Sequence, residues 1–202
     1  MLHDLGKGLP NVRKLNKEGQ PSDPGHEAES AIMAKAILTR LGYNKSFVHL
    51  VTWLVAQHMR FAPMLLTGER TLLRWVRSEA ANSGFRTQAE LTQAYSLLVE
   101  VFLADMGATH ARENEQLMAE GRLLGRQVVE LVRTRMPVCS KDLAVGGREL
   151  LELIPHAEIK NILTYLLERV QSGNLPNEKE ALLTAVHKHL KRKTTLSLGE
   201  QL

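Results

Sequence analysis

The spacing of the apolar residues restricts the fold of this chain more than any other feature of its sequence. From residue 27 to residue 135, apolar side chains recur at intervals of three and four, which is the period of an amphipathic helix. No stretch shows the strict alternation of apolar and polar residues that a half-buried strand requires. We therefore predict an all-α fold.

Helix-breaking residues divide this pattern into segments. We expect helices over residues 27–41, 47–59, 69–80, 87–106, 112–135, 157–172 and 177–193. Gly173 stands where one helix should end, and Pro63 should stop another. Asn177 followed by Glu180 resembles a capping box at the start of the last helix. Residues 8–25 are rich in Gly, Pro, Asn and Asp and should form a loop.

The character of the sequence changes near residue 138. At 202 residues and 44% hydrophobic content, the chain has enough apolar material to bury a core. Val138–Asp142 is predicted to be an extended connector, and a short glycine-punctuated segment follows it. We predict a main helical domain over residues 1–137, a small helical C-terminal region over 138–193 and a frayed tail over 194–202.

The composition excludes several classes of protein. Cys139 is the single cysteine, so the chain can form no internal disulfide and, by itself, no thiolate zinc site. The apolar runs are too short for a transmembrane helix, and the N-terminus lacks the pattern of a secretory signal. We expect a cytoplasmic protein without membrane contact. The net charge of +4 is a weak indication of a polyanionic partner.

Histidines and aspartates fall on the apolar faces of several predicted helices. Asp105 lies on the apolar face of its helix, where a lone carboxylate is costly unless it is paired or bound to a cation. His58 also lies on a core-facing stripe, and His26 stands at the start of a helix. His3 and Asp4 are adjacent on an expected first helix. Ligands that project inward from facing helices suit a divalent metal site in a helical bundle.

The context of these residues resembles a known superfamily. His3-Asp4, within the run Leu-His-Asp-Leu-Gly-Lys, is similar to the signature of the HD-domain superfamily of metal-dependent phosphohydrolases. His26, His58 and Asp105 stand where such domains place further histidines and a final aspartate. The similarity covers residues 2–106, about half of the chain, and it implies an HD-like helical bundle. It also implies five metal-ligating residues: His3, Asp4, His26, His58 and Asp105.

A narrower resemblance extends beyond that region. The run from His3 to Gly8, a loop and then Gly-His-Glu resemble the HD region of bacterial tRNA nucleotidyltransferases (the CCA-adding enzymes) and of related poly(A) polymerases. Residues 142–150 and 173–178 are similar to the tail region of that family. The chain departs from the family pattern at residues 154–157, where a turn rich in Gly and Pro is usual. The catalytic head is missing from the resemblance, so we expect no nucleotidyl transfer from this chain alone.

The start of the chain bears on the metal sites that the resemblance implies. The HD pattern begins with a histidine tens of residues before the His-Asp pair, and we expect this N-terminus to be a truncation. Asp4, His26 and His58 can still form one complete site. The other site would keep His3, Asp4 and Asp105.

The resemblance implies hydrolysis of a phosphoester on nucleotides or RNA ends, tRNA among them, by a divalent-metal enzyme. Asp4 would be a catalytic residue, and Lys7 would pair with the phosphate. Imidazole and carboxylate ligands fit Mn, Ni, Fe, Co or Zn, and fit Mg less well. One alternative is a non-catalytic RNA-binding module or fragment of a nucleotidyltransferase-family protein. Another is a hydrolase of a signalling nucleotide.

Each candidate residue also has a structural interpretation. His3-Asp4 could be an ordinary helix-start pair, and Asp105 could cap a helix or pair with an arginine. His58 could be a core histidine with satisfied hydrogen bonds, and His26 could serve local hydrogen bonding. Lys7 could be a solvated side chain. The basic run over residues 188–193 fits either RNA phosphates or a solvated helix end.

Overall fold

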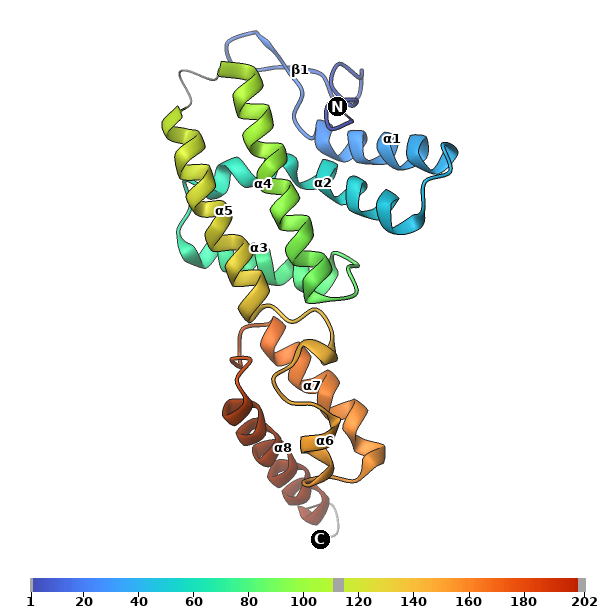
Figure 1. Ribbon diagram of the computed structural model, residues 1–202, viewed down its shortest axis with the longest axis vertical. Helices are drawn as coiled ribbons and strands as arrows, with labels where there is room; N and C mark the ends of the chain where they lie inside the picture. The colour runs from blue at the N-terminus through green and yellow to red at the C-terminus, as the bar shows by residue number, and fades with distance from the viewer. Residues whose placement is uncertain (1, 111–114, 200–202) are drawn as a thin grey trace. The chain divides into compact units, whose positions relative to one another are not determined.

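A computed structural model describes residues 2–110 and 115–199 of the chain (Figure 1). About 70% of the chain is helical, in eight α-helices. The described strands form a single antiparallel hairpin of two residues each, β1 (Lys14–Leu15) and β2 (Pro21–Ser22). The prediction of an all-α fold is confirmed. No helix within these ranges is both long and apolar enough to cross a lipid bilayer.

Seven of the eight helices follow the predicted segments closely, whereas α6 lies where no helix was predicted. They are α1 (His26–Arg40), α2 (Lys45–Met64), α3 (Glu69–Asn82), α4 (Gln88–His110), α5 (Glu115–Arg135), α6 (Gly147–Leu151), α7 (Ile159–Gln171) and α8 (Lys179–Gly199). Two short 3-10 helices, η1 (Ser140–Asp142) and η2 (His156–Glu158), precede α6 and α7. The prediction that residues 138–142 are extended was therefore wrong for η1, where Asp142 N–H donates to the carbonyl of Cys139. Gly173, with a φ of 75°, ends α7 as expected.

Three local expectations differ from the structure. Residues 3–8 form successive turns rather than a first helix. Pro63 lies inside the last turn of α2, which ends one residue later with Leu65 N–H donating to the carbonyl of Ala62. The last helix continues through residues 194–199, where we expected a frayed tail, while residues 200–202 lie outside the described part.

The last helix also begins differently from the prediction. The helix starts at Lys179 rather than at 177, and Oδ1 of Asn177 accepts from the N–H of Ala144 at 2.9 Å. Its Nδ2 donates to the carbonyl of Asp142 at 2.9 Å. This side chain therefore ties the segment before α8 to the segment before α6.

Contacts divide the chain into two compact units. The first comprises Met1–Thr71 and Gln93–Gln127, and the second comprises Leu72–Thr92 and Val128–Leu202. The helices α1 and α2 lie wholly in the first unit, and α6 to α8 lie wholly in the second. The sequence-based domain boundary near residue 138 stays a prediction.

The first unit is built around the helical hairpin of α1 and α2, which pack side by side (Figure 1). Small buried residues on α1, Ala31 and Ala34, lie against Val55 of α2 and allow the helices to approach closely. Aromatic pairs join α2 to α4. Trp53 meets Tyr95 at a ring-centroid distance of 5.3 Å, and Phe61 meets Phe102 at 5.0 Å.

Two glycines allow α5 to pack against α4 in the same unit. A Cβ on Gly121 would overlap Cε1 of Phe102. A Cβ on Gly125 would lie 2.6 Å from Cγ1 of Val99, a distance that Cβ atoms do not adopt. The four-residue spacing puts both glycines on one face of α5, so this face is the one that α4 covers.

The second unit has its own core and its own polar anchor. Buried apolar side chains of the segments from η1 to α8 form one cluster: Leu143, Val145, Leu150, Ile154, Ile162, Leu166, Val170, Leu182 and Val186. Asp142 Oδ2 accepts hydrogen bonds from the N–H groups of Gln88, Val138 and Cys139, at 2.9 to 3.1 Å. This carboxylate fixes the connector in place.

We predict that Gly121→Ala lowers the free energy of unfolding by about 1–3 kcal/mol, because the buried Phe102 ring has little room to move. The matched control is Gly107→Ala on α4, where an added Cβ meets no atom within 4 Å. That control should stabilise the protein by up to about 1 kcal/mol through helix propensity. Chemical denaturation measures both. Equal effects of the two substitutions would contradict the packing described for α4 and α5.

Candidate metal centre

The turn that carries His3 and Asp4 rests directly on the first turns of α1. Gly6 N–H donates to the buried Oγ of Ser30 at 2.8 Å. A Cβ on Gly6 would lie 2.6 Å from the carbonyl oxygen of His26 and 3.0 Å from Ser30 N. Only glycine therefore permits this approach. The contact brings Asp4 beside His26, the first residue of α1.

The loop between the turn and α1 is held by Asp23. Its carboxylate accepts from the N–H of Gly8 at 2.9 Å and from Arg13 Nε and Nη2 at 2.9 and 2.8 Å. The paired hydrogen bonds from Arg13, with that from Gly8, lower the pKa of Asp23 to about 2. The backbone carbonyl of the same residue accepts from Nδ1 of His26 at 2.8 Å, if the ring carries its proton there.

Three ligand atoms from separate elements converge at this point. His26 Nε2 lies 3.2 Å from Asp4 Oδ1 and 3.3 Å from Nε2 of His58, which comes from α2. His58 Nε2 lies 3.9 Å from Asp4 Oδ1. The two histidines are 4% and 7% exposed, while the side chain of Asp4 is 37% exposed. Asp4, His26 and His58 form a group that could hold a metal ion.

The hydrogen bonds of the two rings decide which atoms face the centre. Nδ1 of His58 lies 2.7 Å from the carbonyl oxygen of Val55. In the same way, Nδ1 of His26 lies 2.8 Å from the carbonyl oxygen of Asp23. Because a carbonyl only accepts, each Nδ1 carries the proton and each Nε2 presents a lone pair. Asp4 Oδ1 is buried and has no hydrogen-bond partner among residues 2–110 and 115–199. Three electron-rich atoms thus surround one point, and only a cation, a proton or a metal ion, relieves their repulsion.

The protonation states of the group suit a metal rather than a proton. Burial lowers the pKa of His58, and the rings of His3 and His26 lower it further. Burial alone would raise the pKa of Asp4, but the hydrogen bond from Lys7 and the charges of His3, Lys7 and His26 lower it overall. At neutral pH the group therefore offers a neutral imidazole and an ionised carboxylate, the forms that bind metals.

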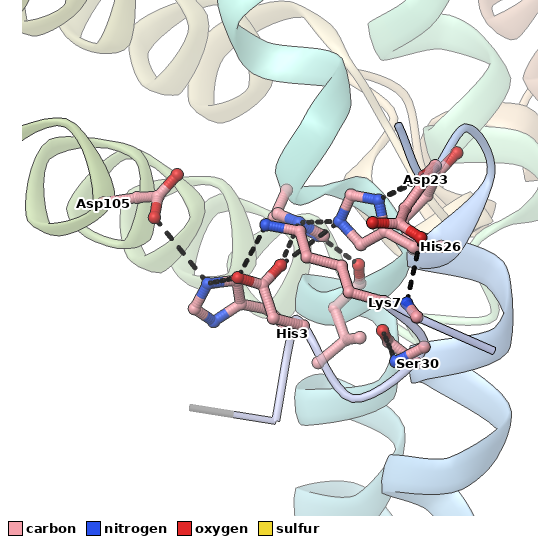
Figure 2. Close-up of polar contacts among 12 residues, drawn as sticks. His3, Lys7, Asp23, His26, Ser30 and Asp105 are labelled. Carbon is pink, nitrogen blue, oxygen red and sulfur yellow. Dashed lines mark hydrogen bonds and ion pairs between the residues drawn. The ribbon is translucent and has the colours of Figure 1, made fainter. Parts of the chain in front are cut away.

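The other oxygen of Asp4 faces a second set of side chains. Asp4 Oδ2 lies 2.8 Å from Nζ of Lys7 and 3.4 Å from Nε2 of His3. That nitrogen is also 3.7 Å from Oδ1 of Asp105, which extends from α4 toward the His3 ring in Figure 2. The side chains of Asp105 and Asp4 are 38% and 37% exposed, so both carboxylates reach solvent while His26 and His58 are buried.

The structure thus gathers all five predicted ligands and Lys7 into one cluster with Asp4 at its middle. Two side chains of this neighbourhood were missed by the sequence analysis, Asp23 and Ser30. A signal for them was present, because Asp23 stands three residues before His26 and Ser30 four residues after it. The assignment of the five residues as metal ligands stays a prediction.

Comparisons of the chain with protein-family models, with curated proteins and with solved structures found no match. The structure itself shows an all-α fold whose first unit contains the Asp4/His26/His58 group. The resemblance to HD domains rests on the residues of the chain alone.

We predict that the Asp23 carboxyl titrates near pH 2, against an ordinary value of 3.8. Because the folded pKa is depressed, the Asp23–Arg13 pair stabilises the fold above about pH 4, and this stabilisation disappears as pH falls toward 2. Carbon-13 NMR of the carboxyl measures the pKa. Asp23→Asn should lower the melting temperature at pH 7, and the difference should shrink below pH 4. Titration of the Asp23 carboxyl near pH 3.8 would contradict the described hydrogen bonds from Arg13 and Gly8.

We also predict that Gly6→Ala separates the turn from α1, because its Cβ would collide with the carbonyl of His26. The free energy of unfolding should fall by about 1–3 kcal/mol. The side-chain NMR signals of His26 and His58 should shift, while Gly107→Ala leaves them in place. Unchanged histidine signals in Gly6→Ala would show that the turn does not position Asp4.

Proposed function

We propose that Asp4, His26 and His58 bind a divalent transition metal and that the protein is an HD-domain phosphohydrolase. The observation that carries the proposal is the meeting of two buried imidazole nitrogens with a buried carboxylate oxygen that has no hydrogen-bond donor. The order of these residues in the chain, resembling the HD pattern, supports the same conclusion. The substrate we propose is a phosphorylated nucleotide or an RNA end, tRNA included.

The ligand set favours particular metals. Two imidazoles and one carboxylate suit Mn, Ni, Fe, Co or Zn better than Mg, which prefers oxygen ligands. Backbone carbonyls hold both rings by Nδ1, which is the usual way in which a protein orients a metal-binding histidine. Three protein ligands leave positions for water and substrate, as catalytic sites require.

When bound, a divalent ion supplies a water of lowered pKa and neutralises charge on phosphoryl oxygens. The side chains divide the remaining work. Asp4 points Oδ1 at the centre, while Lys7 and His3 hold Oδ2 and fix the carboxylate plane. Lys7 is 47% exposed, so its ammonium can also pair with a substrate phosphate. His3 lies between Asp4 and Asp105, where it can hold or pass a proton.

We predict that metal-stripped protein binds one Mn, Ni, Co or Zn ion tightly per chain. With manganese or nickel it should hydrolyse a chromogenic phosphodiester. Asp4→Ala and His58→Ala should each weaken metal affinity and lower the rate by at least about tenfold. Isothermal titration calorimetry measures the metal affinity. Absorbance of the released chromophore measures the rate of hydrolysis. Affinity should also fall with decreasing pH, because protonated histidines do not bind metal.

The controls match the variants in residue type. Glu18→Ala removes an exposed carboxylate, and His187→Ala removes an exposed histidine of the second unit. Both should bind and hydrolyse like the unaltered protein. Absence of metal binding would contradict the whole proposal. Metal binding without hydrolysis of any nucleotide or RNA substrate would overturn the enzyme assignment and favour the non-catalytic alternative.

A further inference from the structure

A long part of the first unit lacks acidic residues altogether. Residues 30–68 contain no Asp and no Glu, although the chain has 22 acidic residues in all. This part covers most of α1, the connecting turn and the whole of α2. Its four cationic residues are all exposed: Lys35, Arg40, Lys45 and Arg60. The acidic residues of α1, Glu27 and Glu29, both lie in its first turn, so the part of the hairpin from residue 30 onward carries only cationic charge.

Two aromatic rings are exposed where the hairpin turns. Tyr43 and Phe47 stack on each other at a centroid distance of 4.9 Å and an interplanar angle of 24°. They are 51% and 40% exposed, and neighbouring Leu41 is 62% exposed. The side chain of Asn44 accepts from Phe47 N–H at 2.8 Å and so fixes the start of α2 beneath the rings. The pair is therefore stacked and about half open to solvent.

Two cations stand beside this stack in the sequence. Arg40 is the last residue of α1 and Lys45 is the first residue of α2. Within residues 2–110 and 115–199, neither of them forms an ion pair. The first turn of α2 carries no acidic residue, so its backbone N–H groups add to the positive potential. We call Arg40, Leu41, Tyr43, Lys45 and Phe47 the hairpin tip.

We propose that the hairpin tip binds single-stranded nucleic acid. A base would extend the Tyr43–Phe47 stack, and the flanking phosphates would pair with Arg40 and Lys45. Single-strand binding has two components, exposed aromatic faces and unpaired cations. The aromatic faces suit any base because every base has a π-face, and the cations suit any nucleotide because each carries a negative charge. A duplex hides its base faces and would use only the cations.

The tip is separate from the metal centre. His26 and Arg40 are the two ends of α1, and a helix of 15 residues is about 20 Å long. The inference gives the nucleic-acid partner of the proposed function a place on the molecule, but it does not depend on metal binding. Binding should therefore persist in Asp4→Ala and in a chelator, whatever becomes of the hydrolase assignment.

Fluorescence anisotropy of the full chain with a labelled 15-nucleotide oligouridine tests the proposal. The double variant Tyr43→Ala, Phe47→Ala should weaken binding about 5- to 100-fold, the range for the loss of one stacked base. The double variant Arg40→Gln, Lys45→Gln should weaken binding and reduce the slope of log affinity against log salt by about 0.7 for each lost phosphate contact. The aromatic variant should keep its affinity for polyphosphate, which has charge but no bases.

Matched controls use exposed residues away from the tip. Leu66→Ala removes an apolar side chain that is 92% exposed, and Lys17→Gln removes an exposed cation of the loop. Both should bind oligouridine normally. The proposal is overturned by absence of binding, by equal affinity for a duplex of the same length, or by an aromatic variant that binds as well as the unaltered chain. A concentration-dependent dimer that the aromatic variant abolishes would instead make the tip a protein interface.

Discussion

The contact between Gly6 and the second turn of α1 is the constraint on which the metal centre depends. Its N–H satisfies the buried hydroxyl of Ser30, and its missing side chain leaves room for the carbonyl of His26. Through this contact a turn with no helical structure of its own holds Asp4 at a fixed place beside a helix. The glycine of the His-Asp-x-Gly-Lys run thus has a physical role that is independent of any resemblance.

The chemistry of the centre follows from how its rings are held. Each histidine gives its Nδ1 proton to a backbone carbonyl, Asp23 for His26 and Val55 for His58. The remaining lone pairs turn inward against a carboxylate oxygen, and burial lowers the pKa of His58. A fold that places three acceptors together without a donor stabilises a cation there. The same burial that makes the arrangement costly without a cation strengthens its interaction with one.

The helices of this arrangement could be predicted from the periodicity of the sequence, but the turn at His3-Asp4 and the contacts of Asp23 could not. The three- and four-residue spacing predicted the helices that carry His26, His58 and Asp105, because burial of an apolar stripe is a local property of the sequence. The turn at His3-Asp4 was predicted to be a helix, and that prediction was wrong. The hydrogen bond that places the turn, from Gly6 N–H to Ser30 Oγ, joins residues 24 positions apart, so no local pattern reveals it. The hydrogen bonds of Asp23 are also absent from any local pattern, because its partners Gly8 and Arg13 lie 15 and 10 residues earlier in the chain.

Two features lie at opposite ends of α1, the candidate metal centre at His26 and the hairpin tip at Arg40. The claim that most needs a direct measurement is that a metal ion occupies the first of these. Anomalous diffraction from crystals grown with cobalt or zinc, collected on both sides of the metal edge, locates the ion. The account predicts one strong peak within bonding distance of Asp4 Oδ1 and of Nε2 in both histidines. A fully ordered centre without a peak at saturating metal, or a peak on other residues, would contradict it.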